Sequence, residues 1–245
     1  MSRFKAAGIH LGISFVIFVF LAYLVLFEWY PGIFFNTDGG WRGMRIIVGV
    51  DLVLGPTLTL VAYKAGKPGL KFDLTAIALL QTVCLIAGTY VVWSEKPQTV
   101  VYVDGRIQVV TTDDYRDNGF DGVPDLSHIP GDSPKWVRVD VPEGLEAEAD
   151  FRSDLLRKGT SIIAAVDHYE PFDPHHPGFI EDPRDLARIR KLPGAETALK
   201  KWTSEHGGTL EDYNFYLFTT RYVYRYAGFH RTSGDMLGFL DLKPR

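Results

Sequence analysis

The fold is decided by the stretch IIVGVDLVLGPTLTLVAY, which occupies residues 46–63 and contains one charged residue, Asp51. Two further apolar runs flank it, at residues 11–27 and 74–93, and neither contains a charged residue. A helix needs about 20 apolar residues to cross a bilayer core, where each backbone group must form its hydrogen bond within the segment. The sequence therefore predicts a membrane protein with three transmembrane helices, at about residues 9–28, 45–63 and 73–93.

These helices are expected to form an anchor of residues 1–96, with residues 97–245 as a separate domain. The anchor contains eight Lys or Arg and five Asp or Glu, whereas the remainder contains 18 and 25. An acidic domain of this kind disfavours binding to nucleic acid or lying flat on anionic lipid. Its roughly 150 residues are enough to bury a core. The only cysteine, Cys84, lies in the third apolar run, so packing alone must hold that domain.

The basic residues predict the orientation of the helices. Arg3 and Lys5 precede the first helix, and Lys64, Lys67 and Lys71 lie in the short bridge between the second and third. Short loops rich in Lys and Arg remain in the cytoplasm. We therefore expect a cytoplasmic N-terminus and an extracytoplasmic C-terminal domain. No small-residue cleavage site closes the first run, which is expected to remain as an anchor rather than be removed as a signal peptide.

The pattern of residues 97–245 predicts an α+β domain built on an antiparallel sheet. The clearest local signal is the turn Asp104-Gly105, which predicts a hairpin. Strands are expected at Gln98–Val103, Arg106–Thr112, Lys135–Val141, Tyr213–Tyr226 and Met236–Leu242. Helices are expected at Glu143–Lys158, from Asp182-Pro183 to Lys191, and at Ala195–His206.

Asp51 is the residue with the clearest functional signal. A charged side chain near the middle of a bilayer costs about 2.5–3.5 kcal/mol on insertion scales, so it normally faces protein or water. Gly49, Gly55 and Pro56 lie close to it in sequence. Proline bends a helix and frees a backbone carbonyl, and glycine lets a second helix approach closely. Together these four residues are candidates for binding a partner helix.

Two other roles for Asp51 remain open at this stage. The carboxylate can instead be satisfied within the three-helix bundle, by Thr57, Thr59 or Gln81, for example. A proton relay is less favoured, because we identify no second intramembrane acid or histidine placed to continue it.

Tyr222, Tyr224 and Tyr226 have the two-residue period of one strand face. Aromatic residues favour strands, so these rings are candidates for sheet packing. Tyrosine is also enriched at protein interfaces. We therefore keep the three residues as a second candidate surface for a protein partner, with core packing as the alternative.

Two clusters contain residue types that bind metals. Asp117, Asp121 and Asp125 resemble part of a calcium loop, but Gly119 and His128 occupy positions where that loop needs ligands. His168, His175 and His176 lie among prolines, without the spacing of a zinc-binding helix. Both clusters are weak candidates. No cofactor is expected, because no phosphate-binding, dinucleotide-binding or nucleophile-elbow motif occurs in the sequence.

Several segments resemble the type IV pilin accessory proteins of the TfpX/TfpZ family. The strongest is VGVDLVLGP at residues 48–56. The others are MSRFKAAGIHL at 1–11, WYPG at 29–32, KFDL at 71–74, SGD at 233–235 and LDLKP at 240–244. The resemblance is strong over residues 1–96 and weaker beyond them.

The resemblance implies a multi-pass inner-membrane protein of a Gram-negative bacterium with a periplasmic C-terminal domain. It also implies a non-enzymatic chaperone or accessory role in fimbrium biogenesis, with the major type IV pilin as protein partner. No nucleic acid and no small-molecule substrate are expected. Two alternatives remain: a membrane-anchored periplasmic sensor or regulatory subunit that binds a ligand, and a metal-dependent membrane-tethered hydrolase that uses the histidine cluster.

Overall fold

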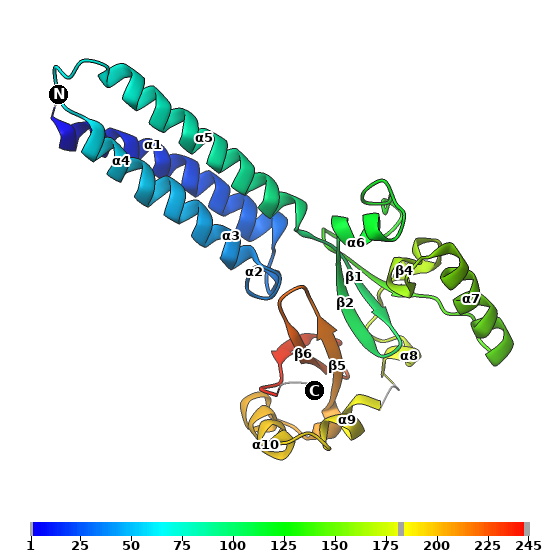
Figure 1. The fold of residues 1–245 in the computed structure, drawn as a ribbon. Helices are drawn as coiled ribbons and strands as arrows, with labels where there is room; N and C mark the ends of the chain where they lie inside the picture. The colour runs from blue at the N-terminus through cyan, green and yellow to red at the C-terminus, as the bar shows by residue number, and fades with distance from the viewer. Residues whose placement is uncertain (1, 181–183, 243–245) are drawn as a thin grey trace. The chain divides into compact units, whose positions relative to one another are not determined.

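A computed structural model of the chain describes residues 2–180 and 184–242 (Figure 1). The chain divides into two compact units, Met1–Lys96 and Pro97–Arg245. We refer to them as the helical unit and the sheet unit, and describe each by itself.

In the helical unit, the described residues contain three helices long and apolar enough to cross a membrane: Arg3–Trp29, Gly40–Ala62 and Leu70–Ser94. The first consists of α1 (Arg3–Tyr23) and the π-helix η1 (Leu24–Trp29). The second consists of α3 (Gly40–Ile47), the π-helix η2 (Val48–Leu54) and α4 (Gly55–Ala62). The third is α5 (Leu70–Ser94), and a short helix α2 (Phe34–Thr37) precedes α3. The prediction of three long apolar helices is confirmed.

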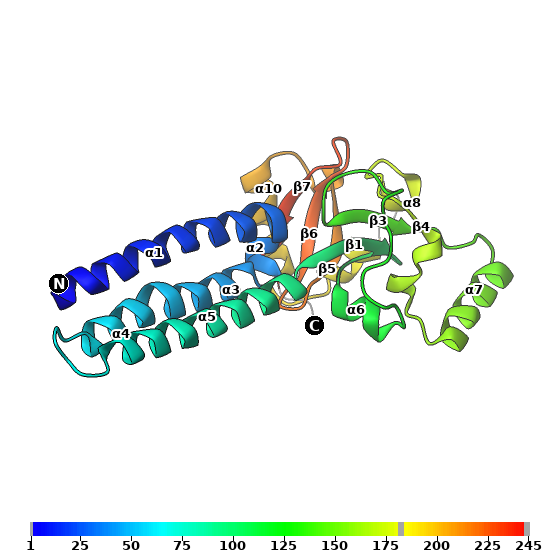
Figure 2. The same ribbon diagram turned by 90° about the horizontal axis from the view of Figure 1, so that it is seen from above.

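Each helix begins before the apolar run that predicts it, because a capping residue lies upstream. The side chain of Ser2 accepts a hydrogen bond from the backbone N–H of Lys5 at 3.2 Å and so caps α1. Gly39 and Gly69 precede the other two helices with φ values of 103° and 81°, a region that favours glycine. The helices run side by side in both views (Figures 1 and 2), and α1 and α5 each pack against the middle helix.

In the sheet unit, seven strands among the described residues form one mixed sheet in the order β4-β3-β1-β2-β5-β6-β7. The strands are β1 (Pro97–Val103), β2 (Arg106–Thr111), β3 (Lys135–Val139), β4 (Tyr169–Pro171), β5 (Tyr213–Thr219), β6 (Tyr224–His230) and β7 (Met236–Phe239). The expectation of an antiparallel sheet is wrong, because β1 pairs with β3 and β2 pairs with β5 in parallel. Both pairs are joined by long connections containing helices, which parallel pairing requires.

The expected single strand over Tyr213–Tyr226 is also wrong, because a turn divides it into β5 and β6. The backbone N–H of Thr220 donates to the carbonyl of Val223 at 2.8 Å. The Thr220 hydroxyl accepts from the backbone N–H groups of Tyr222 and Val223. These bonds favour the turn over a continued strand.

Five α-helices occur among the described residues of the sheet unit: α6 (Thr112–Asp117), α7 (Leu145–Lys158), α8 (Pro177–Ile180), α9 (Arg184–Ile189) and α10 (Ala195–His206). The β1–β2 hairpin and α10 confirm their predictions, and α7 begins two residues later than expected. The expected helix start at Asp182-Pro183 lies outside the described residues.

Two apolar clusters form much of the core of the sheet unit. One joins β1, β2 and β3 to α7 through residues such as Val101, Val137 and Phe151. The other joins β5 and β6 to α10, where Trp202 is buried beside Phe215. In the first cluster the hydroxyls of Tyr115 and Tyr169 lie 3.4 Å apart, and burial raises the pKa of both.

Gly228 of β6 gives the first testable prediction. A Cβ atom added there would lie 2.3 Å from Cζ2 of the buried Trp202 ring, a rigid neighbour that cannot yield cheaply. We expect Gly228→Ala to lower the free energy of unfolding of the sheet unit by about 1–3 kcal/mol, the usual cost of overpacking. The measurement is denaturant unfolding of the full chain in detergent, followed by tryptophan fluorescence. Ser153→Thr adds one methyl group on the exposed side of α7 and serves as control.

Candidate functional site

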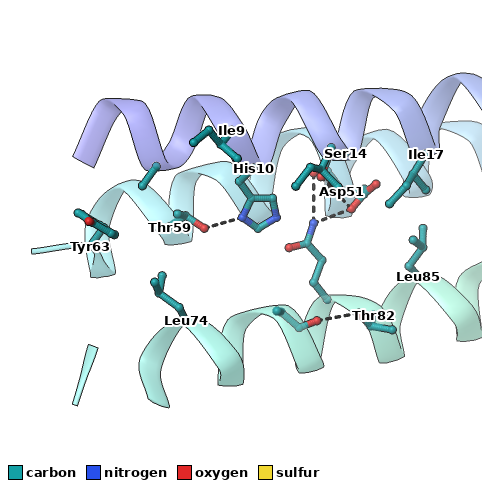
Figure 3. A pocket seen from close by; sticks show the side chains of 14 residues that line it. Ile9, His10, Ser14, Ile17, Asp51, Thr59, Tyr63, Leu74, Thr82 and Leu85 are labelled. Atoms are coloured by element: carbon teal, nitrogen blue, oxygen red, sulfur yellow. Dashed lines mark hydrogen bonds between the residues drawn. The ribbon is translucent and has the colours of Figure 1, made fainter. Parts of the chain in front are cut away.

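The helical unit contains a cavity of about 380 Å³, which we call the three-helix groove. Side chains of 14 residues line this groove (Figure 3). They are Ala6, Ile9, His10, Ile13, Ser14, Ile17, Asp51, Thr59, Tyr63, Leu74, Ala78, Gln81, Thr82 and Leu85. Those of α1 and α5 recur at three- and four-residue intervals, so each helix turns one face to the groove.

Asp51 joins the three helices at this groove. Its side chain is 2% exposed. Oδ1 accepts hydrogen bonds from the Ser14 hydroxyl of α1 at 3.2 Å and from Nε2 of Gln81 of α5 at 2.6 Å. The bundle therefore satisfies one oxygen of this carboxylate. Gln81 is one of the internal partners expected from the sequence, whereas Ser14 is not.

Pro56 shapes the backbone beside Asp51. In η2 the hydrogen bonds reach back five residues, as from the N–H of Gly55 to the carbonyl of Val50. Pro56 has no N–H group, so it cannot donate to the Asp51 carbonyl five residues before it. Nε2 of Gln81 donates to that carbonyl instead, at 3.3 Å. Because of the proline, the backbone carbonyl of Asp51 is free to accept this second hydrogen bond from Gln81, besides the one that its side chain accepts.

Gly55 makes room for this contact. A Cβ atom added to Gly55 would lie 2.3 Å from both terminal atoms of the Gln81 side chain. Gly49, by contrast, has nothing within 4 Å of its added Cβ position. Of the glycines expected to receive a partner helix, Gly55 therefore packs within the bundle and Gly49 faces open space.

His10 is a groove residue that the sequence reasoning missed. Its Nδ1 lies 2.6 Å from Oγ1 of Thr59, and Figure 3 shows its ring in the groove that also contains Asp51. The signal was available, because His10 and Ser14 are four residues apart and share a helix face. The groove therefore contains a histidine as well as the carboxylate.

The groove has acceptors without donors. Among the described residues, Oδ2 of Asp51 and Oε1 of Gln81 are buried and have no hydrogen-bond partner. Buried polar groups are nearly always hydrogen-bonded, so such exceptions point to a group that completes them. The groove offers apolar walls and a few convergent polar atoms, an arrangement typical of a binding site.

The six weak metal candidates are not brought together. Within the described ranges, no three His, Cys, Asp or Glu residues are grouped so that they could hold a metal ion. Oδ1 of Asp125 accepts from the backbone N–H of Ser127, which lowers the pKa of its carboxyl. Nδ1 of His176 accepts from the N–H of Gly178, and the His168 ring packs against Phe151. The other three candidates, Asp117, Asp121 and His175, belong to no such group among the described residues either.

The three candidate tyrosines of the sheet unit have different environments. Tyr226 is 7% exposed and belongs to the core cluster of β5, β6 and α10. Tyr222 lies in the turn before β6 and Tyr224 at the start of β6, with 37% and 48% exposure. Tyr222 and Tyr224 therefore offer accessible rings, and Tyr226 serves packing.

Comparison with known proteins gives a match to a protein family. The model of "Fimbrial assembly protein FimB" matches residues 1–32. A fimbrial assembly protein of Dichelobacter nodosus, serogroups C1 and C2, is 30% identical over 113 residues, which cover 45% of this chain and 86% of the relative. The serogroup E1 and serogroup I proteins of that organism are each 32% identical over 113 residues, 45% of this chain.

The match spans less than half the length of the serogroup E1 and serogroup I relatives, at 44% of each. No solved structure matches the chain at a significant level.

The role of Gly55 can be tested directly. Gly55→Ala displaces the end of Gln81 and breaks its hydrogen bonds to Asp51, so we expect the helical unit to lose about 1 kcal/mol, the usual strength of an interhelical hydrogen bond. The measurement is thermal unfolding in detergent, followed by circular dichroism. Gly49→Ala is the matched control on the same helix and should leave the transition unchanged. Equal shifts for the two variants would contradict the packing role of Gly55.

Proposed function

Because the chain belongs to the fimbrial assembly protein family, we propose that it is a TfpX/TfpZ-type accessory protein of type IV pili. In this proposal it binds and stabilises the major pilin before or during pilus assembly and catalyses no reaction. The observation that supports it most directly is the three-helix groove, with apolar walls and a buried carboxylate.

The groove suits a helix as its occupant. Its lining residues on α1 run from Ala6 to Ile17, roughly 16 Å at the rise of an α-helix. The wall side chains, such as Ile9, Ile13 and Leu85, are large and aliphatic. A pilin subunit with an apolar membrane helix would shield part of that helix from lipid by packing here. Van der Waals contact and polar bonds between helices stabilise such pairs.

The sheet unit would supply the second contact. We propose that the helical unit crosses the bacterial inner membrane with its N-terminus in the cytoplasm, so that the sheet unit is periplasmic. Tyr222 and Tyr224 present exposed rings that can contact the pilin outside the membrane. Once one contact between this protein and the pilin has formed, the second forms at a high effective concentration. Each contact can therefore be weak while the overall binding is strong.

Blocking the groove tests this function. Ile13 lines the groove and is 58% exposed, so Ile13→Trp fills the space without touching the bonds of Asp51. We expect this variant to lower pilin co-purification and surface piliation about tenfold or more, equivalent to about 1.4 kcal/mol of binding. The measurement is pilin recovered with the tagged protein from detergent-solubilised native membranes, together with the count of surface pili.

Val16→Trp is the matched control. Val16 is 69% exposed on the same helix and lies outside the groove. Normal piliation with Ile13→Trp, or equal loss with both variants, would contradict a binding role for the groove.

A further inference from the structure

Only one of the two carboxylate oxygens of Asp51 accepts hydrogen bonds among the described residues. Oδ1 has two donors, from Ser14 and Gln81, whereas Oδ2 has none among the described residues. Oε1 of Gln81, the residue that holds Oδ1, also lacks a donor. Two buried acceptors, on two side chains that line the groove, are therefore without donors among the described residues.

The charges in the groove define that group further. Asp51 is the only carboxylate among the 14 lining residues, and none of them is lysine or arginine. The Ser14 hydroxyl and the Gln81 amide are neutral donors. His10 is the one lining side chain that can carry a positive charge, but its Nδ1 bonds to Thr59, and no ion pair joins it to Asp51 among the described residues. A charge buried among apolar helices is strongly stabilised by an opposite charge that also satisfies its lone pairs.

We propose that the three-helix groove binds a membrane helix carrying a protonated amine, which donates hydrogen bonds to Oδ2 of Asp51 and Oε1 of Gln81. This inference rests on the proposed function in one respect, that the occupant is a membrane helix. It goes beyond that function by naming the chemical group, a protonated amine, that Asp51 and Gln81 recognise. An ammonium group carries three donors and one positive charge, which matches the two acceptors and the unpaired carboxylate.

The position of Asp51 fixes the depth of the amine. Asp51 lies at the middle of the span Gly40–Ala62, and Gln81 lies close to the middle of Leu70–Ser94. The amine is therefore required near the centre of the occupant helix when the two helices overlap fully. A helix with its amine near one end would bind only after sliding along the groove by several residues.

Model helices test this without the natural partner. The full chain is placed in lipid nanodiscs with Leu/Ala-rich membrane helices that differ only at one central residue: Lys, Leu, Ser or Glu. A central residue stays at the same depth in either insertion direction. Association is measured by energy transfer between labels on the helix and on the protein. We expect the Lys helix to bind about tenfold more tightly than the Leu helix.

Two variants of the protein test whether Asp51 causes the preference for the Lys helix. Asp51→Asn keeps the size of the side chain and removes its charge, and should abolish the preference for Lys. Thr57→Val is the control, because Thr57 is exposed on the same helix and its hydroxyl donates only to the backbone carbonyl of Val53. It should leave the preference intact.

Three results would overturn the inference: equal binding of the Lys and Leu helices, a Lys preference that survives Asp51→Asn, or a Ser or Glu helix that binds as tightly as the Lys helix. These results are distinguishable from failure of the proposed function. If Lys is not preferred but Ile13→Trp still removes pili, only the amine is excluded. If Lys is preferred but Ile13→Trp leaves pili intact, only the pilin role is excluded.

Discussion

The organisation of the helical unit depends on the buried carboxylate of Asp51. A charge at this position is expensive in an apolar bundle, so the surrounding helices must supply donors. Ser14 and Gln81 do so from the two outer helices, while Gly55 and Pro56 open the space and the backbone carbonyl that Gln81 uses. Within the VGVDLVLGP segment, Asp51, Gly55 and Pro56 therefore act together to hold Gln81.

The same constraint creates the groove. Because both outer helices pack on the middle one around Asp51, their facing sides leave a cavity lined by aliphatic and polar side chains. One oxygen of the carboxylate accepts hydrogen bonds from the bundle, and the other is buried without a donor among the described residues. The internal and the intermolecular interpretations of Asp51 are thus compatible, because each concerns a different oxygen of one side chain.

The sequence was sufficient for the long helices, the Asp104-Gly105 hairpin and α10, because each carries a local signal in apolar run length, turn residues or caps. It was insufficient for the mixed sheet, since parallel pairing of β2 with β5 depends on residues far apart in the chain. The turn at Thr220 was missed although the two-residue period changes phase there, from odd positions up to Leu217 to even positions from Tyr222. His10 was overlooked because it lies at the end of an apolar run, and only the bundle shows that it shares a groove with Asp51.

The most direct test of the central claim is photo-crosslinking in living cells at two neighbouring positions of α5. Ala78 lines the groove, whereas Leu79 is 64% exposed and lies outside it. A photoreactive amino acid at position 78 is predicted to capture a pilin subunit, identified by mass spectrometry, and the same group at position 79 is predicted not to. Absence of a protein adduct at 78, or equal capture at both positions, would contradict the proposal that the groove receives a partner helix.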